Sequence, residues 1–260
     1  MLAGAVHQGR IVPSASTAPA LTGLFLFDCD QDGPRISIPR PEIQIVVRFG
    51  PSARGGLDVH AFGVRQTVHR KLIRGGQRTV TARLRLGAPL AVLGVPASEL
   101  AGRIVGLEDL WGDAGTQRLC ARLAEARHTL DAAAILDSAI AERLAGTAEQ
   151  PSQAALALAA LERLQSAHVN AVAVELGVSE RHLRRVFRDT VGVSPKAFAR
   201  LARFRRALRA ARDDAPASWA SIAASAGYYD QAHLIAEFRA IAGVTPRALL
   251  GELRTAPSLG

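Results

Sequence analysis

The sequence predicts an α+β protein in which a sheet-rich half precedes an all-helical half. Up to about Gly94 the apolar residues alternate with period two, which indicates strands with one buried face. After about Pro96 the apolar spacing becomes helical. With 260 residues and 48% hydrophobic content, the chain can bury the core of one large domain or of two ordinary ones.

The candidate strands are short and are separated by Gly, Pro and Asp clusters. In chain order they are "GLFLFDCD", "RISIP", "EIQIVVRFG", "LDVHAFGV" and "TVTARLRLG". The third places Ile43, Ile45, Val47 and Phe49 on one side, and the last does the same with Val80, Ala82, Leu84 and Leu86. The alternating pattern of these short segments therefore predicts an antiparallel sheet or a small barrel for this half of the chain.

A helical extension is expected over about residues 115–146, in "TQRLCARLAEARHTL" and "DAAAILDSAIAERLAG". Thr116 and Asp131 are plausible N-caps, and Gly146 is a plausible stop. The polar segment 146–153 contains Pro151 and predicts a boundary between a regulatory domain, residues 1–150, and a second domain, residues 151–260. Ser152 can cap the helix that follows this boundary.

The second domain contains an internal duplication. "VNAVAVELGVSERHLRRVFRDTVGVSP" matches "WASIAASAGYYDQAHLIAEFRAIAGVTP", and the second copy has one extra residue in its turn. Each copy predicts a short helix, a turn at Gly177 or Gly227, a second helix capped by Ser179 or Asp230, and a Gly-Val-Ser/Thr-Pro stop. This is the layout of a helix-turn-helix, whose second helix lies in the DNA major groove.

Positive charge is concentrated in the same region. The net charge is +9, and between Ser179 and Arg212 eleven Lys or Arg accompany only two acids. In the second helix of the first copy, one face is apolar, with Leu183, Val186 and Phe187, and the opposite face is basic, with Arg181, Arg184, Arg185 and Arg188. Guanidinium groups bond guanine edges and phosphates, so we expect the apolar face to pack and the basic face to contact DNA.

A helix is predicted between the two copies, in "PKAFARLARFRRALRAARDDAP". Pro195 begins it, and Asp213, Asp214 and Pro216 end it. About seventeen helical residues span roughly 26 Å. A linker of this length can set two recognition helices about one duplex turn apart, roughly 34 Å, in adjacent major grooves.

At about residues 166–254 the chain resembles the AraC/XylS family of bacterial transcription regulators. The resemblance is carried by "ELGVSERHLRRVF", "GVSPKAF", "RLARFRRALRAAR" and "IAASAGYYDQAHLIAEFRAIAGVTP". The first half is similar to the sheet-rich sensor region of one subgroup, through "LRLGAPLAVLGVPASELAGRIVGLEDLWG". The resemblance implies two helix-turn-helix modules that bind double-stranded DNA, a regulatory N-terminal domain, and control of transcription through contact with RNA polymerase.

The resemblance also assigns roles to residues. The base-facing positions of the first module fall on Arg181, Arg184 and Arg185, with Arg188 better placed for phosphate. Those of the second module fall on Gln231, Ala232 and Ala236, and the alanines depart from the polar residues of a base-recognising helix. His233 and Arg239 complete the predicted DNA-binding set. His182 and His233, at equivalent positions, either donate to phosphate or help the turn to pack. Tyr228 and Tyr229 are expected to pack the longer second turn, with a phosphate bond from one of the two hydroxyls as the alternative.

Two other classes of protein fit parts of the sequence. A metal-binding barrel enzyme with an accessory DNA-binding domain would need a ligand set, but His60 and His69 have no Asp or Glu at a suitable spacing and no catalytic motif occurs. We therefore expect no enzyme, metal or cofactor. A non-specific architectural DNA binder stays open as the alternative.

The remaining expectations concern location and partners. The amino terminus lacks a secretory signal pattern and no apolar run is long enough for a membrane span, so a cytoplasmic protein without membrane contact is expected. Cys29 and Cys120 are expected as small buried hydrophobes rather than a disulfide or zinc site. The sequence leaves open a small-molecule effector, a homodimer, and whether the regulator is an activator or a repressor.

Overall fold

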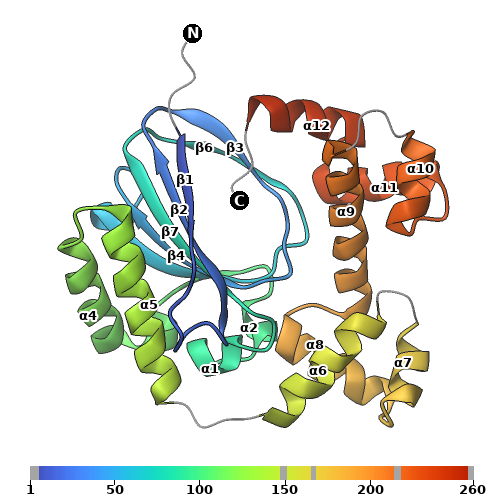
Figure 1. Cartoon of the computed structure of the whole chain (residues 1–260), viewed down its shortest axis with the longest axis horizontal. Coiled ribbons are helices and arrows are strands. Elements are labelled where there is room, and N and C mark those ends of the chain that lie inside the picture. Colours follow the sequence, from blue (N-terminus) through green and yellow to red (C-terminus); the bar gives the residue numbers. More distant parts are fainter. Residues whose placement is uncertain (1–5, 147–150, 165–167, 214–217, 257–260) are drawn as a thin grey trace.

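The computed structural model describes residues 6–146, 151–164, 168–213 and 218–256 (Figure 1). The N-terminal part has an antiparallel main sheet with the strand order β1-β2-β7-β4-β5-β8. The bounds of these strands are β1 Val6–Ile11, β2 Leu21–Cys29, β4 Gln44–Phe49, β5 Leu57–Phe62, β7 Gln77–Leu84 and β8 Ile104–Gly106. Strands β3 (Gly33–Ser37) and β6 (His69–Ile73) pair with each other and form a separate β3–β6 ribbon.

The two faces of the main sheet differ in chemistry. One face carries apolar side chains such as Ile45, Val47 and Val80, each fully buried. This face is covered by helices α4 (Asp113–Ala124) and α5 (Thr129–Ala145), with the short helices α1 (Pro89–Leu93), α2 (Ala97–Leu100) and α3 (Glu108–Trp111) nearby. The other face, which carries Gln44, Thr79 and Thr81, looks toward the β3–β6 ribbon. Because successive side chains of a strand point to opposite faces, the alternating apolar residues of β4 and β7 lie on the face that the helices cover.

The C-terminal part is helical. Its helices are α6 Pro151–Arg163, α7 Val169–Glu175, α8 Glu180–Val191, α9 Pro195–Asp213, α10 Trp219–Ala226, α11 Gln231–Ala242 and α12 Pro246–Thr255. Helices α7 and α8 form the first module, α10 and α11 form the second module, and α9 connects them (Figure 1). The predicted α+β class, with a sheet-rich part before two helix-turn-helix units and a linker helix, is confirmed.

Several local expectations need correction. Helix α4 begins at Asp113, so Thr116 is a buried residue of its first turn and not its N-cap. Helix α5 begins at Thr129, and Asp131 is its third residue, whose carboxylate accepts a hydrogen bond from the His128 N–H at 3.1 Å. Gly146 ends α5 as predicted. Residues 147–150, the Ser152 side chain, Asp214 and Pro216 lie outside the described residues, and α9 is described to Asp213.

The strands β1, β6 and β8 were not predicted. Strand β6 exposes four of its five residues, and β8 has only three residues, so neither has a clear alternating pattern. Strand β1 is an edge strand with β2 as its neighbour in the main sheet. Of the cysteines, Cys29 is buried and Cys120 is half-buried, and both are free thiols. Among the helices that the structure describes, none is both long and apolar enough to cross a membrane.

The N-terminal part contacts both modules. At the first module, the Ser98 hydroxyl of α2 donates to Asp189 of α8 at 2.9 Å, and a Cβ added at Gly192 would lie 3.0 Å from the Ala97 carbonyl oxygen. Gly192, at φ +90°, therefore ends α8 and also allows the close approach of α2.

At the second module, the N–H of Val68 donates to the Ile241 carbonyl at 2.8 Å. The Arg70 guanidinium donates to the Ala242 carbonyl at 2.9 Å and to Glu252 of α12 at 2.7 Å. Ile36 of the β3–β6 ribbon is 2% exposed and lies in the apolar core of the second module. The core of the first module is likewise continuous with that of the main sheet, so both modules are held by the N-terminal part.

A substitution at the fully buried Phe187 tests the contribution of this shared core to stability. Replacement by alanine should lower the free energy of unfolding by about 3–5 kcal/mol, because it leaves a cavity between α8 and its neighbours. Val174→Ala in the same module is the control, since Val174 is 81% exposed and its loss should change stability by less than about 0.5 kcal/mol. Chemical denaturation measures both, and equal effects would contradict the assigned helix face.

Candidate nucleic-acid interface

The first module presents α8 through a tight turn and a cap. Gly177 has φ +67°, a left-handed conformation that glycine adopts without steric cost. The Ser179 hydroxyl accepts a hydrogen bond from the His182 N–H at 3.2 Å and so satisfies one of the free N–H groups at the start of α8. Both features agree with the sequence prediction, and together they fix where α8 begins and the direction it takes.

Helix α8 has one packed face and one free face. Leu183, Val186 and Phe187 are at most 1% exposed. The arginines on the opposite face are all exposed, namely Arg181, Arg184, Arg185 and Arg188. Because α8 packs on α6, α7 and α2 through its apolar side, the basic side is left for a partner. The position of these residues is as predicted, and their contact with DNA stays a prediction.

Two of the four arginines are held along the helix. Arg184 forms an ion pair with Glu180, with 2.7 Å between Arg184 Nε and Glu180 Oε1. A guanidinium nitrogen of Arg185 lies 3.1 Å from Nδ1 of the half-buried His182. An exposed pair four residues apart in a helix contributes only about 0.3–0.5 kcal/mol, so either arginine can leave its partner for a phosphate or a base at low cost.

The second module repeats the geometry with different chemistry. Gly227 has φ +84°, and the Asp230 carboxylate accepts from the His233 N–H at 2.7 Å. Leu234 and Phe238 are fully buried. The predicted contact residues Gln231, His233 and Arg239 are exposed, as are Ala232 and Ala236. The outer face of α11 therefore offers fewer hydrogen-bonding groups than that of α8.

The two tyrosines of the second turn behave differently. Tyr228 is 5% exposed and packs in the turn, with its ring edge-on to His233 at 5.4 Å between centroids. Tyr229 is 93% exposed, so the expectation that it packs the turn is wrong. It precedes the N-cap Asp230 and so adds an exposed phenol just before the start of α11.

A buried acid on α11 was missed by the sequence analysis. Glu237 is 8% exposed and pairs with Arg203 of α9 at 3.0 Å and with Arg200 at 3.5 Å. Burial and the Glu237 carboxylate raise the pKa of Tyr228. The signal was present in the repeat, because Glu237 occupies the position of the core residue Val186 in the first copy. An acid at a core position indicates a buried partner, which α9 supplies.

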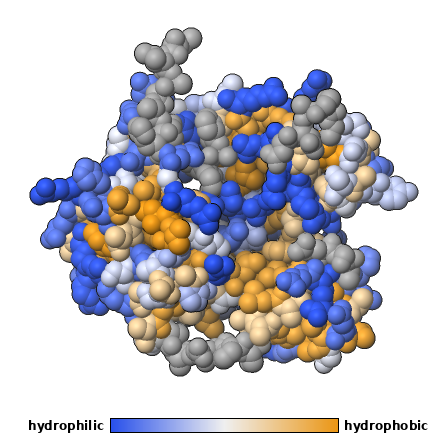
Figure 2. All heavy atoms as spheres, viewed as in Figure 1, coloured by the Kyte–Doolittle hydropathy of each residue, from blue (hydrophilic) through white to orange (hydrophobic). Residues whose placement is uncertain are grey.

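Helix α9 combines an apolar side with many arginines. Phe198 packs edge-on against Phe187 of the first module at 5.7 Å between ring centroids, and Phe204 packs on Phe238 of the second at 4.6 Å. In the view of Figure 2, hydrophilic residues form a band over α9 between the two modules. The arginine-rich helix α9 thus holds α8 and α11 through one aromatic contact with each module.

No metal centre is found in this region or elsewhere in the described residues. Within residues 6–146, 151–164, 168–213 and 218–256, no group of three or more His, Cys, Asp or Glu side chains is placed to hold a metal ion.

Comparison with known proteins identifies the C-terminal part. Residues 172–252 match the family model described as a helix-turn-helix domain. A comparison with curated proteins found no match.

Three solved structures illustrate the similarity. A transcriptional regulator with an AraC-type DNA-binding domain from Chromobacterium violaceum is 24% identical over 40% of this chain and 95% of its own, with a TM-score of 0.34. A DNA-binding transcriptional dual regulator from Escherichia coli K-12 is 23% identical over 41% of this chain and 96% of its own, with a TM-score of 0.33. ToxT from Vibrio cholerae strain SCE256, crystallised with an unsaturated fatty acid, is 9% identical over 89% of this chain and 95% of its own, with a TM-score of 0.45.

The Glu237 network should stabilise the second module measurably. Glu237→Gln removes the charge that faces Arg200 and Arg203 and should lower the free energy of unfolding by about 1–3 kcal/mol, because two half-buried cations lose their partner. Glu252→Gln is the matched control, since the Arg70–Glu252 pair is more exposed and should contribute less than about 1 kcal/mol. Amide hydrogen exchange in α11 reports the difference, and equal effects would show that burial adds nothing to the Glu237 pair.

Proposed function

We propose that the protein is a transcription regulator of the AraC type that recognises a specific DNA sequence. The proposal starts from residues 172–252, which match the family model of a helix-turn-helix domain. The observation that supports specificity is the pairing of two capped recognition helices, α8 and α11, on one linker helix. Helix α9 has 19 residues, which corresponds to about 28 Å at 1.5 Å per residue. This length suits two helices placed about one duplex turn apart, roughly 34 Å.

The contact residues divide by role. We assign base contacts to Arg181, Arg184 and Arg185, because guanidinium groups bond guanine edges bidentately. Arg188, near the end of α8, is assigned to phosphate. In the second module Gln231 is assigned to an adenine edge, and His233 and Arg239 to the backbone.

The alternative is a non-specific architectural DNA binder. Such a protein needs a basic surface but no duplicated, capped and oriented recognition helices, and it often inserts apolar wedges into the minor groove. The exposed face of α8 carries arginines and no large apolar side chain. This composition favours a sequence-recognising helix in the major groove.

Regulation is proposed to come from the N-terminal part. We assign residues 1–150 as the regulatory domain and residues 151–260 as the DNA-binding domain. The reason is that α2 touches the first module and the β3–β6 ribbon touches the second, so that the N-terminal part can alter their positions. A small-molecule effector, RNA polymerase and a second copy of the chain are the proposed partners. A DNA-binding regulator of this kind is expected to act in the cytoplasm.

Arginine substitutions test the proposed recognition. Once genome-wide mapping has supplied a bound site, Arg184→Ala or Arg185→Ala should cost about 1–3 kcal/mol in binding to that site and relax specificity at one or two base pairs. Arg118→Ala, at an exposed arginine of α4, is the control and should leave binding unchanged. Equal affinity of the unmodified protein for its site and for scrambled DNA would reject sequence recognition in favour of the architectural alternative.

The difference between the two modules gives a second test. Base-by-base substitution across an operator of roughly 20 base pairs should cost about 1–3 kcal/mol per position under the first module and much less under the second. The reason is that α8 offers four exposed arginines, whereas the matching positions of α11 are Gln231, Ala232 and Ala236. Under the second module, backbone contacts and groove shape should dominate. Equal penalties would mean that Gln231, His233 or Tyr229 contacts bases.

A further inference from the structure

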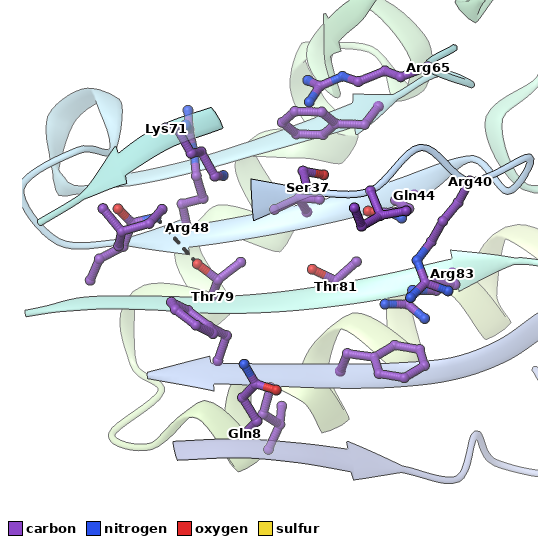
Figure 3. Close-up of a pocket in the computed structure, with 18 residues that line it drawn as sticks. Gln8, Ser37, Arg40, Gln44, Arg48, Arg65, Lys71, Thr79, Thr81 and Arg83 are labelled. Carbon is purple, nitrogen blue, oxygen red and sulfur yellow. Dashed lines mark hydrogen bonds between the residues drawn. The ribbon is translucent and has the colours of Figure 1, made fainter. Parts of the chain in front are cut away.

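A pocket lies between the polar face of the main sheet and the β3–β6 ribbon. Its volume is about 120 Å³. Figure 3 shows Gln44 and Arg48 of β4, and Thr79, Thr81 and Arg83 of β7, on its sheet side. Apolar rings and chains complete the walls, including Phe25, Phe27, Phe62, Val46 and Ile73. The pocket thus combines an apolar wall with a row of polar groups, as small-molecule sites usually do.

The polar lining is strongly cationic. Five basic side chains line the pocket, namely Arg40, Arg48, Arg65, Lys71 and Arg83. Of the described residues that line it, none is an Asp or a Glu. We name this site the cation pocket.

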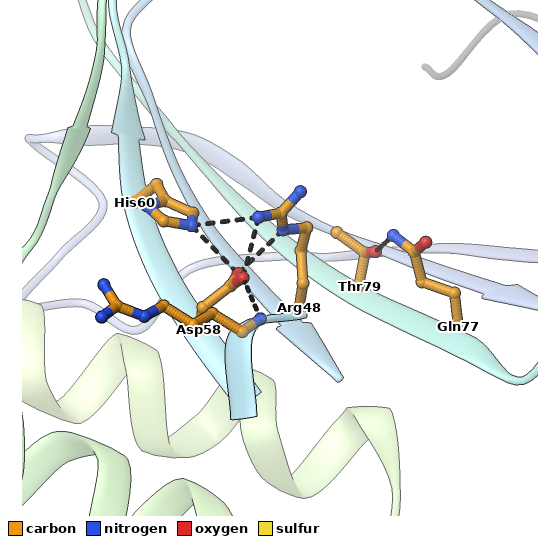
Figure 4. A network of polar contacts seen from close by, with 6 residues as sticks. Arg48, Asp58, His60, Gln77 and Thr79 are labelled. Atoms are coloured by element: carbon orange, nitrogen blue, oxygen red, sulfur yellow. Dashed lines mark hydrogen bonds and ion pairs between the residues drawn. The ribbon is translucent and has the colours of Figure 1, made fainter. Parts of the chain in front are cut away.

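Arg48 already has an anionic partner outside the pocket. Its guanidinium donates to both oxygens of Asp58 at 2.8 Å, and His60 Nε2 lies 3.1 Å from Asp58 (Figure 4). Burial raises the pKa of Asp58, but the hydrogen bonds from Arg48 and from the Arg54 N–H outweigh this and hold it below its usual value. Asp58 is therefore ionised and neutralises Arg48, so the remaining charge of the cation pocket comes from the other four cations.

Arg83 is the most buried cation of the pocket. It is 7% exposed, and its guanidinium carbon lies 3.6 Å from the centroid of the Phe25 ring. Its Nε atom has no hydrogen-bond partner in the described part of the chain. Burial, followed by the charge of Arg40, lowers the pKa of Arg83 to about 10. Glu42 raises this pKa in part, but no ion pair joins it to Arg83 in the described part of the chain. A buried guanidinium without a paired carboxylate is costly, and an anion at this position would offset that cost.

The pocket continues toward the linker helix. Figure 3 shows Arg40 and Arg83 side by side at one end, and an adjoining hollow is lined by Arg40, Arg65 and Glu42. Glu42 lies 3.9 Å from Arg205 of α9. Burial and the charge of Arg205 lower the pKa of Arg40, while Glu42 raises it. The charge of Glu42 thus acts on Arg40, Arg83 and Arg205, and Arg205 belongs to the helix that connects both modules.

We propose that the cation pocket binds a small organic acid, whose anionic group lies between Arg40 and Arg83 and whose apolar body packs on Phe25 and Phe62. The proposal rests on the proposed regulatory function and names the chemical class of its effector. The bound anion neutralises Arg40 and Arg83, which changes the field at Glu42 and at its contact with Arg205. Occupancy of the pocket is in this way coupled to the position of α9.

Matched pairs of an acid and its neutral amide test this assignment. Benzoate and benzamide have the same ring and nearly the same size, so calorimetry on the full chain at constant ionic strength isolates the contribution of the charge. Benzoate should bind at least tenfold more tightly than benzamide. Inorganic phosphate should bind at least tenfold more weakly than phenyl phosphate, because it lacks the apolar body. Equal binding of benzoate and benzamide, or no binding of benzoate, overturns the proposal. Equal binding of phosphate and phenyl phosphate would show that the apolar walls do not contribute to ligand binding.

Substitutions locate the site. Arg83→Gln and Arg40→Gln should each weaken benzoate binding at least tenfold, whereas Arg74→Gln should change it less than twofold, because Arg74 is exposed beyond the end of β6 and does not line the pocket. The melting temperature of ligand-free Arg83→Gln should equal or exceed that of the unmodified protein, since the variant removes an unpaired buried charge. A clear fall in this temperature, or benzoate binding that survives in Arg83→Gln, contradicts the assignment.

The same measurements separate this proposal from the DNA-binding one. Arg184→Ala should lose specific DNA binding and keep its affinity for benzoate, and Arg83→Gln should keep DNA binding without acid. In the unmodified protein, benzoate should shift the affinity for the mapped site at least threefold, and this shift should be absent in Arg83→Gln. Benzoate binding without any such shift overturns the coupling to α9, and loss of specific DNA binding in the unmodified protein counts against the proposed function alone.

Discussion

The packing of α9 into two cores is the constraint on which the arrangement of both modules depends. Phe198 belongs with the core of the first module and Phe204 with that of the second. Because backbone hydrogen bonds fix the rise and rotation between residues of a helix, these two contacts set both the separation and the relative rotation of α8 and α11. The Glu237 pairs with Arg200 and Arg203 add a polar restraint on the second module only. A rigid linker with an aromatic anchor at each module explains how one chain can present two recognition helices in register.

Much of this fold follows from patterns that local physics makes visible. Strands β4 and β7 were predicted because one face of each is buried, so that alternation appears in the residues themselves. Strand β6 was missed because nearly all of its residues are exposed, so no buried face imposes an alternation of apolar and polar residues on it. The start of α4 was misplaced because Gly112 and Asp113 begin it without a side-chain cap, while the cap-like Thr116 is buried inside its first turn. A residue type that favours N-caps indicates a helix start only where its hydroxyl or carboxylate is free to accept a hydrogen bond from the first turn of the helix.

The candidate sites differ in how far the sequence reveals them. The recognition helices were predictable because a duplication, a cap and a helical period all act within about twenty residues. The cation pocket was not, because Arg40, Arg65 and Arg83 come from separate segments and are brought together only by the register of the sheet and by the loops that cross it. Gln44, Thr79 and Thr81 do occupy the positions that alternate with core residues, but Phe27 of the same face packs with Ile73 of the ribbon, so the alternation alone does not mark this face as a polar site.

The burial of Ile36 in the core of the second module has a consequence for how the protein is made. The β3–β6 ribbon leaves the ribosome long before α11 and α12, yet Ile36, with Ile38 and Val68 beside it, packs against side chains of those last helices. During synthesis this apolar strip has no native cover, and it gains one only when the end of the chain emerges. A nascent or truncated chain that lacks the second module therefore exposes these apolar side chains. Completion of the chain is the step that covers them and protects the N-terminal part from self-association.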